Sequence, residues 1–316
     1  MDNKILKTFE AFNKLSSELK EIIVGKNEQI DKTLACLLAR GHILLEDMPG
    51  VGKTSLASAL ATAIRGSFSR IQFTSDLLPF DIIGTKIYRR QTEVFEFEKG
   101  PIFSNVILAD ELNRASPKTQ SALLQVMNES EVSIDKTTYE MAKPFIVIAT
   151  QNPSGSNGTY PLPESQLDRF MMRISLGYPS PEFEKVILLK YSKGLKETNP
   201  KTLLDPEQVI EAQDYICNIT VDDKVIDYIV KLVDTTRQHP EILQAVSTRG
   251  SVALLRASQA VAFLKGKDFV TIDMVKSIAN EVLAHRISLK KSLRLMDKTA
   301  NSEWFSCEII QKVNVE

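Results

Sequence analysis

The sequence predicts an α/β domain built on a parallel sheet, followed by a domain made of helices. Up to Pro181, short apolar segments alternate with helical patterns, as in βαβ units, whereas past Pro181 the chain reads as helices alone. A glycine-containing turn that ends in Gly52-Lys53-Thr54 joins the first strand candidate to a helix. We therefore expect an α/β domain over residues 1–178 and a helical domain over residues 179–316.

Five segments have the length and composition of strands in a parallel sheet. Each is short and apolar, as a sheet covered on both faces requires, and helical patterns separate them. These strand candidates are residues 42–46, 70–74, 106–109, 145–150 and 172–176. Helices are expected between them at 53–64 and 118–128, and an amphipathic helix at 5–22 precedes them.

Two β-hairpins are expected between these elements. Residues 86–88 and 94–97 have strand composition and flank a polar turn at 89–92. A second hairpin is expected at 131–141, where Val132 and Ile134 alternate with polar residues, although its turn signal is weaker than Asn-Gly or Asp-Gly.

The second domain is expected to hold at least four helices. Ser180 can cap a helix whose first residue is Pro181. Further helices are expected to begin after Pro206, after Asp223, near Ser247 and near Thr271.

The turn after the first strand is typical of a phosphate-binding loop. Glycines let the backbone N–H groups approach an anion closely, and the helix that follows directs its positive dipole end to the same place. Lys53 would contact the β- and γ-phosphates, and the Thr54 hydroxyl would bind Mg²⁺. We expect the nucleotide to be bound by residues of this loop and of the first helical turn, namely Pro49, Gly50, Val51, Gly52, Lys53, Thr54 and Ser55.

Asp47 stands where the usual pattern of this loop has glycine. An acid beside a triphosphate would repel it, so we expect the Asp47 carboxylate to point away from the nucleotide.

Asp110 and Glu111 end the third strand candidate, where ligands bind in a parallel sheet. Asp110 fits the role of holding Mg²⁺ through a water molecule. Glu111 fits that of orienting and polarising the water that attacks the γ-phosphate. Asn152 follows the next strand candidate and could hold the same water, or it could simply begin a turn before Pro153.

Two arginines are candidates for stabilising phosphate charge. Arg169 lies between a short helix and the last strand candidate, where it could reach the γ-phosphate of a neighbouring subunit or be an ordinary ion-paired residue. Arg249 lies in the first turn of a helix, where the dipole disfavours a cation unless an anion is nearby, so it is a candidate sensor of the nucleotide.

Composition narrows the classes of function. The chain has 316 residues, 43% of them hydrophobic, and a net charge of -1. This charge produces no overall positive electrostatic potential that would attract nucleic acid. We expect no membrane insertion, no secretory signal and a cytoplasmic protein. Three scattered cysteines and three scattered histidines favour neither a disulfide framework nor a zinc site.

Together these motifs resemble those of the AAA+ ATPases, and in detail those of the MoxR family, over nearly the whole chain. The phosphate loop, with its Asp47, is similar to the MoxR form. So are the segments 110–115, 149–153, 162–170 and 247–249, and Val24-Gly25-Lys26 resembles the segment that contacts adenine.

The resemblance implies a P-loop AAA+ core with a five-stranded parallel sheet and inserted hairpins, then an all-α lid. It also implies Mg²⁺-dependent ATP hydrolysis in a ring, most often a hexamer, with nucleotide at the subunit boundaries. It further implies chaperone-like remodelling of a client, commonly with a partner that bears a von Willebrand factor A domain.

Two other functions stay open at this point. The first is the ATPase subunit of a metal chelatase, which shares the inserted hairpins and the type of partner. The second is a non-hydrolysing scaffold, which Lys53, Asp110 and Glu111 disfavour. A DNA-remodelling enzyme is disfavoured by the near-neutral charge.

Overall fold

A five-stranded sheet lies at the centre of the first domain. The computed structural model describes residues 3–48, 50–135, 137–151, 158–193, 200–290 and 298–313. Every neighbouring pair of strands in this sheet is parallel, as predicted. In spatial order the strands are β2 (Phe68–Gln72), β5 (Val106–Asp110), β8 (Ile146–Gln151), β1 (Ile43–Glu46) and β9 (Met172–Ile174).

Both faces of the sheet are buried, which explains the continuous apolar runs of its strands. Successive side chains of a strand point to opposite faces, so Ile43 and Leu45 join one hydrophobic cluster and Leu44 joins the other. The first cluster continues into the C-terminal helices. The two predicted domains therefore share one core, and the boundary that we place after Tyr178 remains a prediction.

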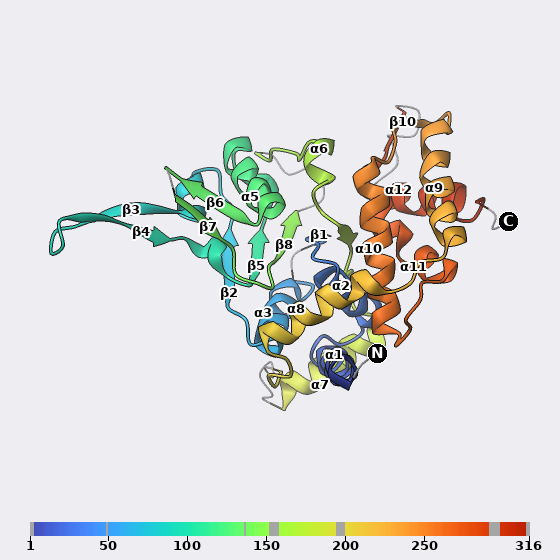
Figure 1. The fold of residues 1–316 in the computed structure, drawn as a ribbon, viewed down its shortest axis with the longest axis horizontal. Helices are drawn as coiled ribbons and strands as arrows, with labels where there is room; N and C mark the ends of the chain where they lie inside the picture. Colours follow the sequence, from blue (N-terminus) through green and yellow to red (C-terminus); the bar gives the residue numbers. More distant parts are fainter. Residues whose placement is uncertain are drawn as a thin grey trace.

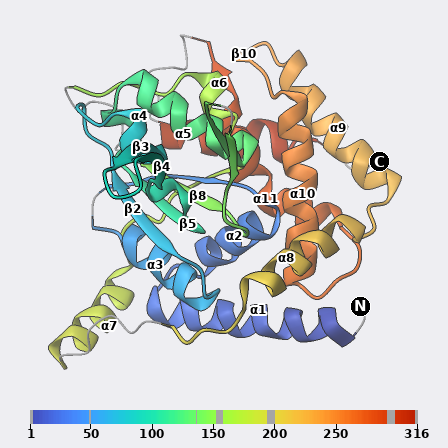
Figure 2. The ribbon, with the colours of Figure 1, turned by 60° about the vertical axis from the view of Figure 1, so that its left-hand side comes forward.

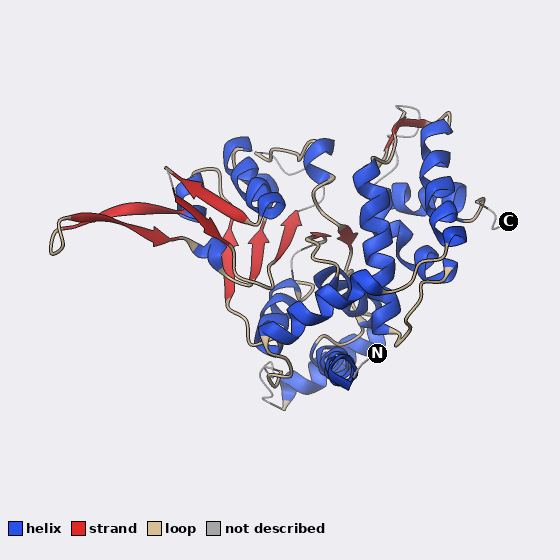
Figure 3. Ribbon diagram, in the orientation of Figure 1, coloured by secondary structure: helices blue, strands red, loops and turns tan. Residues whose placement is uncertain are grey.

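Helices cover the sheet, and two further helices precede its first strand in the chain (Figure 1, Figure 3). The first two pack against each other and against helices from the C-terminal part, and the first lies along one side of the molecule (Figure 2). The helices of the first domain are α1 (Asn3–Ile22), α2 (Asn27–Leu38), α3 (Lys53–Ala63), α4 (Pro79–Ile83), α5 (Pro117–Glu129) and α6 (Glu164–Leu167), with 3₁₀ turns at Pro101–Phe103 and Leu112–Arg114.

Both predicted hairpins are present. The first, of β3 (Gly84–Arg89) and β4 (Val94–Lys99), projects from the rest of the protein as a long ribbon (Figure 1). The second consists of β6 (Glu131–Ile134) and β7 (Thr137–Glu140). Phe97 and Tyr139 connect the two, because their ring centroids lie 4.6 Å apart.

The C-terminal part is helical, and its helices begin where their capping residues predict. The Ser180, Ser247 and Thr271 hydroxyls each accept a hydrogen bond from a backbone N–H of the helix that follows. The helices are α7 (Pro181–Ser192), α8 (Pro206–Tyr215), α9 (Asp223–Gln238), α10 (Thr248–Leu264), α11 (Ile272–Leu283) and α12 (Lys298–Phe305), with 3₁₀ turns at Ile216–Asn218 and Ala284–Arg286 and a π-helical turn at Ser306–Ile310.

The expectation of helices alone past Pro181 is wrong at one point. Strand β10 (Ile242–Gln244) pairs antiparallel with β11 (Ser288–Leu289). Segments of three and two residues are too short to produce a readable period of two. Across the described residues, no helix is both long enough and apolar enough to cross a bilayer.

Candidate functional site

Two glycines of the loop between β1 and α3 have backbone conformations that suit a phosphate cradle. Gly50 and Gly52 adopt φ angles of +85° and +92°, in the left-handed region that side chains disfavour, and Gly52 is the N-cap of α3. The Lys53 side chain is buried and its Nζ donates to the Asp47 carbonyl oxygen at 3.0 Å. The Lys53 ammonium is thereby held across the loop that precedes it.

The other described residues of this loop and of the first turn of α3 differ in exposure. Val51 is buried, Thr54 is exposed in the first turn of α3, and Ser55 is half-buried next to it. Pro49, which we expect to contact the nucleotide, lies outside the described residues.

The Asp47 carboxylate is bound by the chain that leaves β9. It accepts hydrogen bonds from the Ser175 hydroxyl at 2.8 Å, the Leu176 N–H at 2.7 Å and the Gly177 N–H at 2.9 Å. This position agrees with the expectation that the carboxylate points away from phosphate. Asp47 thus joins the phosphate loop to the segment that follows the last strand of the sheet.

Replacing Asp47 with asparagine is expected to lower the free energy of unfolding by about 2–3 kcal/mol. The side-chain NH₂ group would face at least one backbone N–H, so a buried donor would lose its partner. Denaturant unfolding followed by circular dichroism measures the change. As the control, Asp31→Asn changes a half-exposed carboxylate that pairs with Lys20 and should cost less than about 1 kcal/mol. Equal losses for the two variants would contradict the role of Asp47.

The acidic end of β5 lies at the same edge of the sheet as the phosphate loop. Ala109 of β5 and Leu44 of β1 both pair with Ala149 of β8, so Asp110 and Leu45 are at the same level on either side of that strand. Two strand spacings separate them, about 10 Å. The loop that begins two residues after Leu45 therefore faces Asp110 across the end of β8.

Thr150 joins the two acidic residues. Its hydroxyl donates to Asp110 Oδ1 at 2.7 Å and accepts from the backbone N–H of Glu111 at 2.9 Å. Glu111 has a φ of +56°, which is uncommon for a residue with a side chain. This turn separates the two carboxylates, so each can take a different role.

Three further side chains hold the carboxylates, and we did not anticipate them from the sequence. Arg70 pairs with Asp110 Oδ2 at 2.6 Å, while Gln72 Nε2 donates to Glu111 Oε2 at 3.0 Å. Arg114 also donates to Glu111 Oε2, at 2.8 Å, and this pairing raises the pKa of the Arg114 guanidinium. Arg70 and Gln72 share one face of β2. The strand candidate at 70–74 was therefore the sequence signal that could have placed both side chains on the same face of the sheet.

The residues predicted to bind Mg²⁺ fit that ion chemically. Thr54 offers a hydroxyl oxygen and Asp110 a carboxylate, and oxygen donors are what Mg²⁺ prefers. One Asp110 oxygen accepts from Thr150 and the other pairs with Arg70. Each still has lone pairs for a metal-bound water.

The segment expected to contact adenine lies beside the chain that leaves β9. Gly25 has a φ of +78° and packs on the Phe183 ring, since a Cβ added there would lie 2.6 Å from Phe183 Cδ2. Lys26 Nζ donates to the Tyr178 carbonyl oxygen at 2.9 Å. Burial lowers the pKa of Lys26, and the nearby Asp47 carboxylate opposes that shift. Val24 and Gly25 therefore belong to the same region as the phosphate loop.

Arg169 and Arg249 are placed elsewhere in the fold. Arg169 precedes β9, so it stands at the amino end of that strand, whereas the phosphate loop follows the carboxyl end of the parallel neighbour β1. Its NH1 donates to the Leu124 carbonyl oxygen of α5 at 2.9 Å. Arg249 is exposed in the first turn of α10, close to Arg169, because Ser247 donates to the Asp168 carboxylate. The structure thus brings the segments that carry the two arginines together, at the other end of the sheet from the phosphate loop of the same chain.

The last predicted site residue, Asn152, lies outside the described residues. Strand β8 ends at Gln151, at the edge that holds Asp110 and Glu111.

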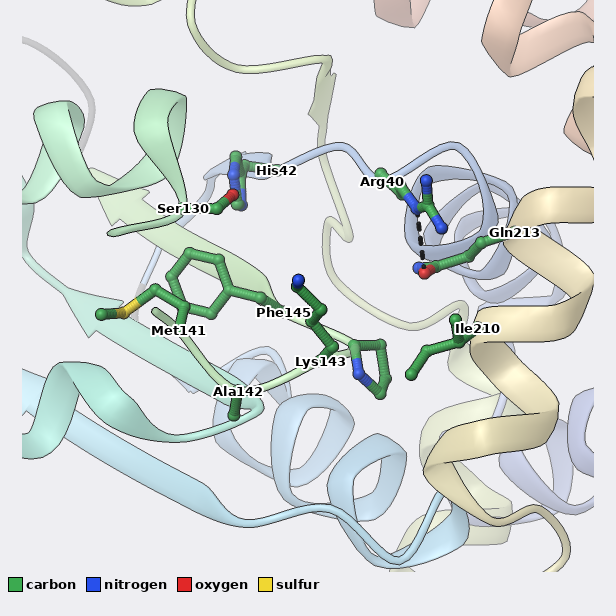
Figure 4. Close-up of a pocket in the computed structure, with 10 residues that line it drawn as sticks. Arg40, His42, Ser130, Met141, Ala142, Lys143, Phe145, Ile210 and Gln213 are labelled. Atoms are coloured by element: carbon green, nitrogen blue, oxygen red, sulfur yellow. Dashed lines mark hydrogen bonds between the residues drawn. The ribbon is translucent and has the colours of Figure 1, made fainter. Parts of the chain in front are cut away.

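A cavity of about 330 Å³ lies at the opposite end of the sheet (Figure 4). It is lined by Arg40, His42 and Phe145, which lie just before β1 and β8, and by Gln213 of α8. His42 is buried and neutral: its Nε2–H faces the Met127 carbonyl oxygen, its Nδ1 accepts from the Val147 N–H, and burial lowers its pKa to about 4. The lining of this cavity includes none of Lys53, Asp110 and Glu111.

Comparisons with known proteins agree with this geometry. The profile of the ATPase family associated with various cellular activities (AAA) matches residues 42–172, and that of the AAA lid domain matches residues 234–303. The crystal structure of a Cytophaga hutchinsonii protein, 38% identical, superposes with a TM-score of 0.89 over 99% of this chain and 97% of that one. The chain is therefore an AAA ATPase with a helical lid, an enzyme class that hydrolyses ATP.

The relatives define the family more closely. The chain is 44% identical to the chaperone MoxR1 of Mycobacterium tuberculosis, over 86% of this chain and 74% of that protein. It is 47% identical to the YeaC protein of Bacillus subtilis, over 87% of this chain and 86% of that protein. It is also 28% identical to the MoxR protein of Methylorubrum extorquens, over 89% and 88% of the two chains. The chain belongs to the MoxR family of AAA ATPases.

Proposed function

We propose that the protein hydrolyses ATP with Mg²⁺ at the edge of the sheet where β1, β5 and β8 end. The observation that carries this proposal is the Thr150 hydroxyl, which joins Asp110 to the backbone of Glu111 opposite the glycine loop. Lys53 and Mg²⁺ would neutralise phosphate charge, with Thr54 and Asp110 holding the metal. Glu111, together with Asn152, would orient the attacking water.

The positions of the two arginines favour a site that is completed by a second subunit. Arg169 and Arg249 stand at the amino end of β9, one strand length from the phosphate loop of their own chain. A guanidinium at that end of the sheet is better placed to act on the nucleotide of a neighbour than on that of its own chain. Contacts of this head-to-tail kind close into rings, and the MoxR resemblance favours a hexamer.

We further propose that hydrolysis remodels a client protein. Two features support this role: the chaperone relative MoxR1, and the β3–β4 ribbon, which extends away from the core where a second protein could contact it (Figure 1). The resemblance also favours a partner with a von Willebrand factor A domain.

Replacing Lys53 with alanine tests whether this loop binds the triphosphate. We expect ATP to bind at least tenfold more weakly and Mg²⁺-dependent phosphate release to stop, because the ammonium that neutralises the phosphates is gone. Equilibrium binding of a fluorescent ATP analogue and a phosphate-release assay measure the two effects, with and without a Mg²⁺ chelator. The control is Lys143→Ala, which removes an exposed lysine paired with Glu140. Unchanged ATP binding by the Lys53 variant would refute the proposed site.

A further inference from the structure

A buried arginine of the lid is bound to the segment that carries Arg169. The Arg286 side chain is only 2% exposed and belongs to the turn after α11. Its Nε donates to Asp168 Oδ1 at 2.8 Å, its NH2 to the Phe170 carbonyl oxygen at 2.8 Å, and its NH1 to that of Met171 at 3.1 Å. Further bonds go to the carbonyl oxygens of Val282 and Asp168, so all five guanidinium N–H groups have a partner. A guanidinium that is bound on every side holds its neighbours in one geometry.

Asp168 connects the same segment to a second element of the lid. Its carboxylate also accepts from the Ser247 hydroxyl, at 3.1 Å and 3.3 Å to the two oxygens. Ser247 is the N-cap of α10, since its hydroxyl accepts from the Gly250 N–H. Asp168 therefore joins the segment before β9, the turn after α11 and the start of α10.

Gly250 allows these elements to approach closely. A Cβ at this position would lie 2.5 Å from Val246 Cγ1 and 3.0 Å from Arg286 Cδ. The first turn of α10 thus packs directly on the Arg286 side chain, which adds an apolar contact to the polar ones.

The contacts that Asp168 and Arg286 make with these elements are called the joint below. The two arginines of the proposed site are next to it. Arg169 follows Asp168 in the chain, and Arg249 is two residues from Ser247. Burial lowers the pKa of Arg286, and the Arg249 charge lowers it further, whereas the Asp168 carboxylate opposes both. The carboxylate thus balances the positive charge that gathers where the lid meets the core.

We propose that Asp168 and Arg286 are positioning residues, which couple the segment of Arg169 to the start of α10 so that Arg169 and Arg249 move as one unit. This inference rests on the proposed function, in which both arginines act on a neighbour's nucleotide. A shift of the lid would then carry both guanidinium groups toward that nucleotide, or away from it, together.

Replacing Asp168 with asparagine tests the joint, because asparagine keeps the shape but removes the charge. We expect kcat for ATP hydrolysis to fall at least tenfold and KM for ATP to stay within twofold, since the phosphate loop is not altered. The matched control is Glu281→Gln. It breaks the ion pair of Lys32 and Glu281, 2.6 Å, which also joins α2 of the core to α11 of the lid and is similarly buried. Equal kcat values for the two variants would overturn the inference.

Hydrogen exchange of the nucleotide-free protein gives a measurement that does not depend on activity. In the Asp168 variant we expect exchange at residues 168–172 and at residues 247–251 to rise together, at least fivefold, while the Glu281 variant shows no rise in either. A rise in only one of the two segments would also overturn the inference. If the Asp168 variant does not fold, Gly250→Ala, which keeps every charge and displaces Arg286, is measured in its place with the same expectations.

The outcome for Arg169→Ala separates this inference from the proposed function. If Arg169→Ala keeps full turnover, the role of Arg169 fails and the joint loses its purpose. If Arg169→Ala is inactive while Asp168→Asn behaves like Glu281→Gln, only the joint is wrong.

Discussion

Replacing Glu111 with glutamine is expected to lower ATP turnover by a factor of about 10² or more while ATP affinity stays within about threefold. Glutamine keeps the length and the hydrogen-bonding ability of the side chain but cannot polarise a water molecule as a carboxylate does. The phosphate loop and Lys53, which provide most of the proposed binding, lie on other elements and are unaffected. The protein should therefore hold ATP without hydrolysing it.

Single-turnover phosphate release and equilibrium binding of ATP measure these two effects separately. The control is Glu140→Gln, because Glu140 is an exposed carboxylate whose partner, Lys143, lies away from the site. Wild-type turnover in the Glu111 variant would remove this residue from the mechanism. A loss of ATP binding equal to the loss of turnover would instead assign Glu111 to binding.

Arg70, Gln72 and Arg114 determine what else the Glu111→Gln substitution changes at the site. These groups contact the two carboxylates, and Gln72 and Arg114 both donate to Glu111 Oε2. A glutamine at position 111 would still contact Gln72 but would lose the ion pair with Arg114.

The sequence was sufficient to predict the sheet and to place Asp110 and Glu111 at the same edge of it as the loop of Lys53. The five strands could be recognised because burial on both faces leaves them apolar throughout, and a parallel sheet places their carboxyl ends at one edge. That rule brings Asp110 and the loop of Lys53 together without knowledge of any distance.

The contacts that hold these residues in place could not be predicted in the same way. Arg70 and Asp110 are 40 positions apart, and only the β2–β5 register shows that they meet. The partners of Asp47 are more than 120 residues away, past the last strand. Periodicity describes which face of an element is buried, but it does not say which side chains of two distant elements pair.

The position of the lid relative to the core could not be predicted from the sequence either. A helical pattern predicts α10 and its cap at Ser247, yet it does not say that this cap meets Asp168. Arg249 was therefore identified as a candidate sensor without knowing whose nucleotide it could reach. The hydrogen bond from Ser247 to Asp168 places the start of α10 beside the segment before β9, at the other end of the sheet from the phosphate loop of its own chain.

Replacing Arg169 with alanine is expected to lower turnover by a factor of about 10² or more without weakening ATP binding, in keeping with a cation that stabilises the transition state. Steady-state phosphate release and ATP-analogue binding measure both effects. The control is Arg65→Ala, which removes an exposed arginine paired with Asp205. If the Arg169 variant binds ATP poorly, the residue supports binding or folding instead.

Mixing two inactive variants decides whether Arg169 acts on its own chain or on a neighbour. The Lys53→Ala subunit retains Arg169, and the Arg169→Ala subunit retains Lys53. In a ring assembled from equal amounts of both, about one interface in four should pair an intact phosphate loop with an intact arginine, so turnover should return to about that fraction of the wild-type rate. If both groups had to be on the same chain, no mixture would recover activity. Recovery therefore requires that Arg169, at the amino end of β9, reaches the nucleotide of the adjoining subunit.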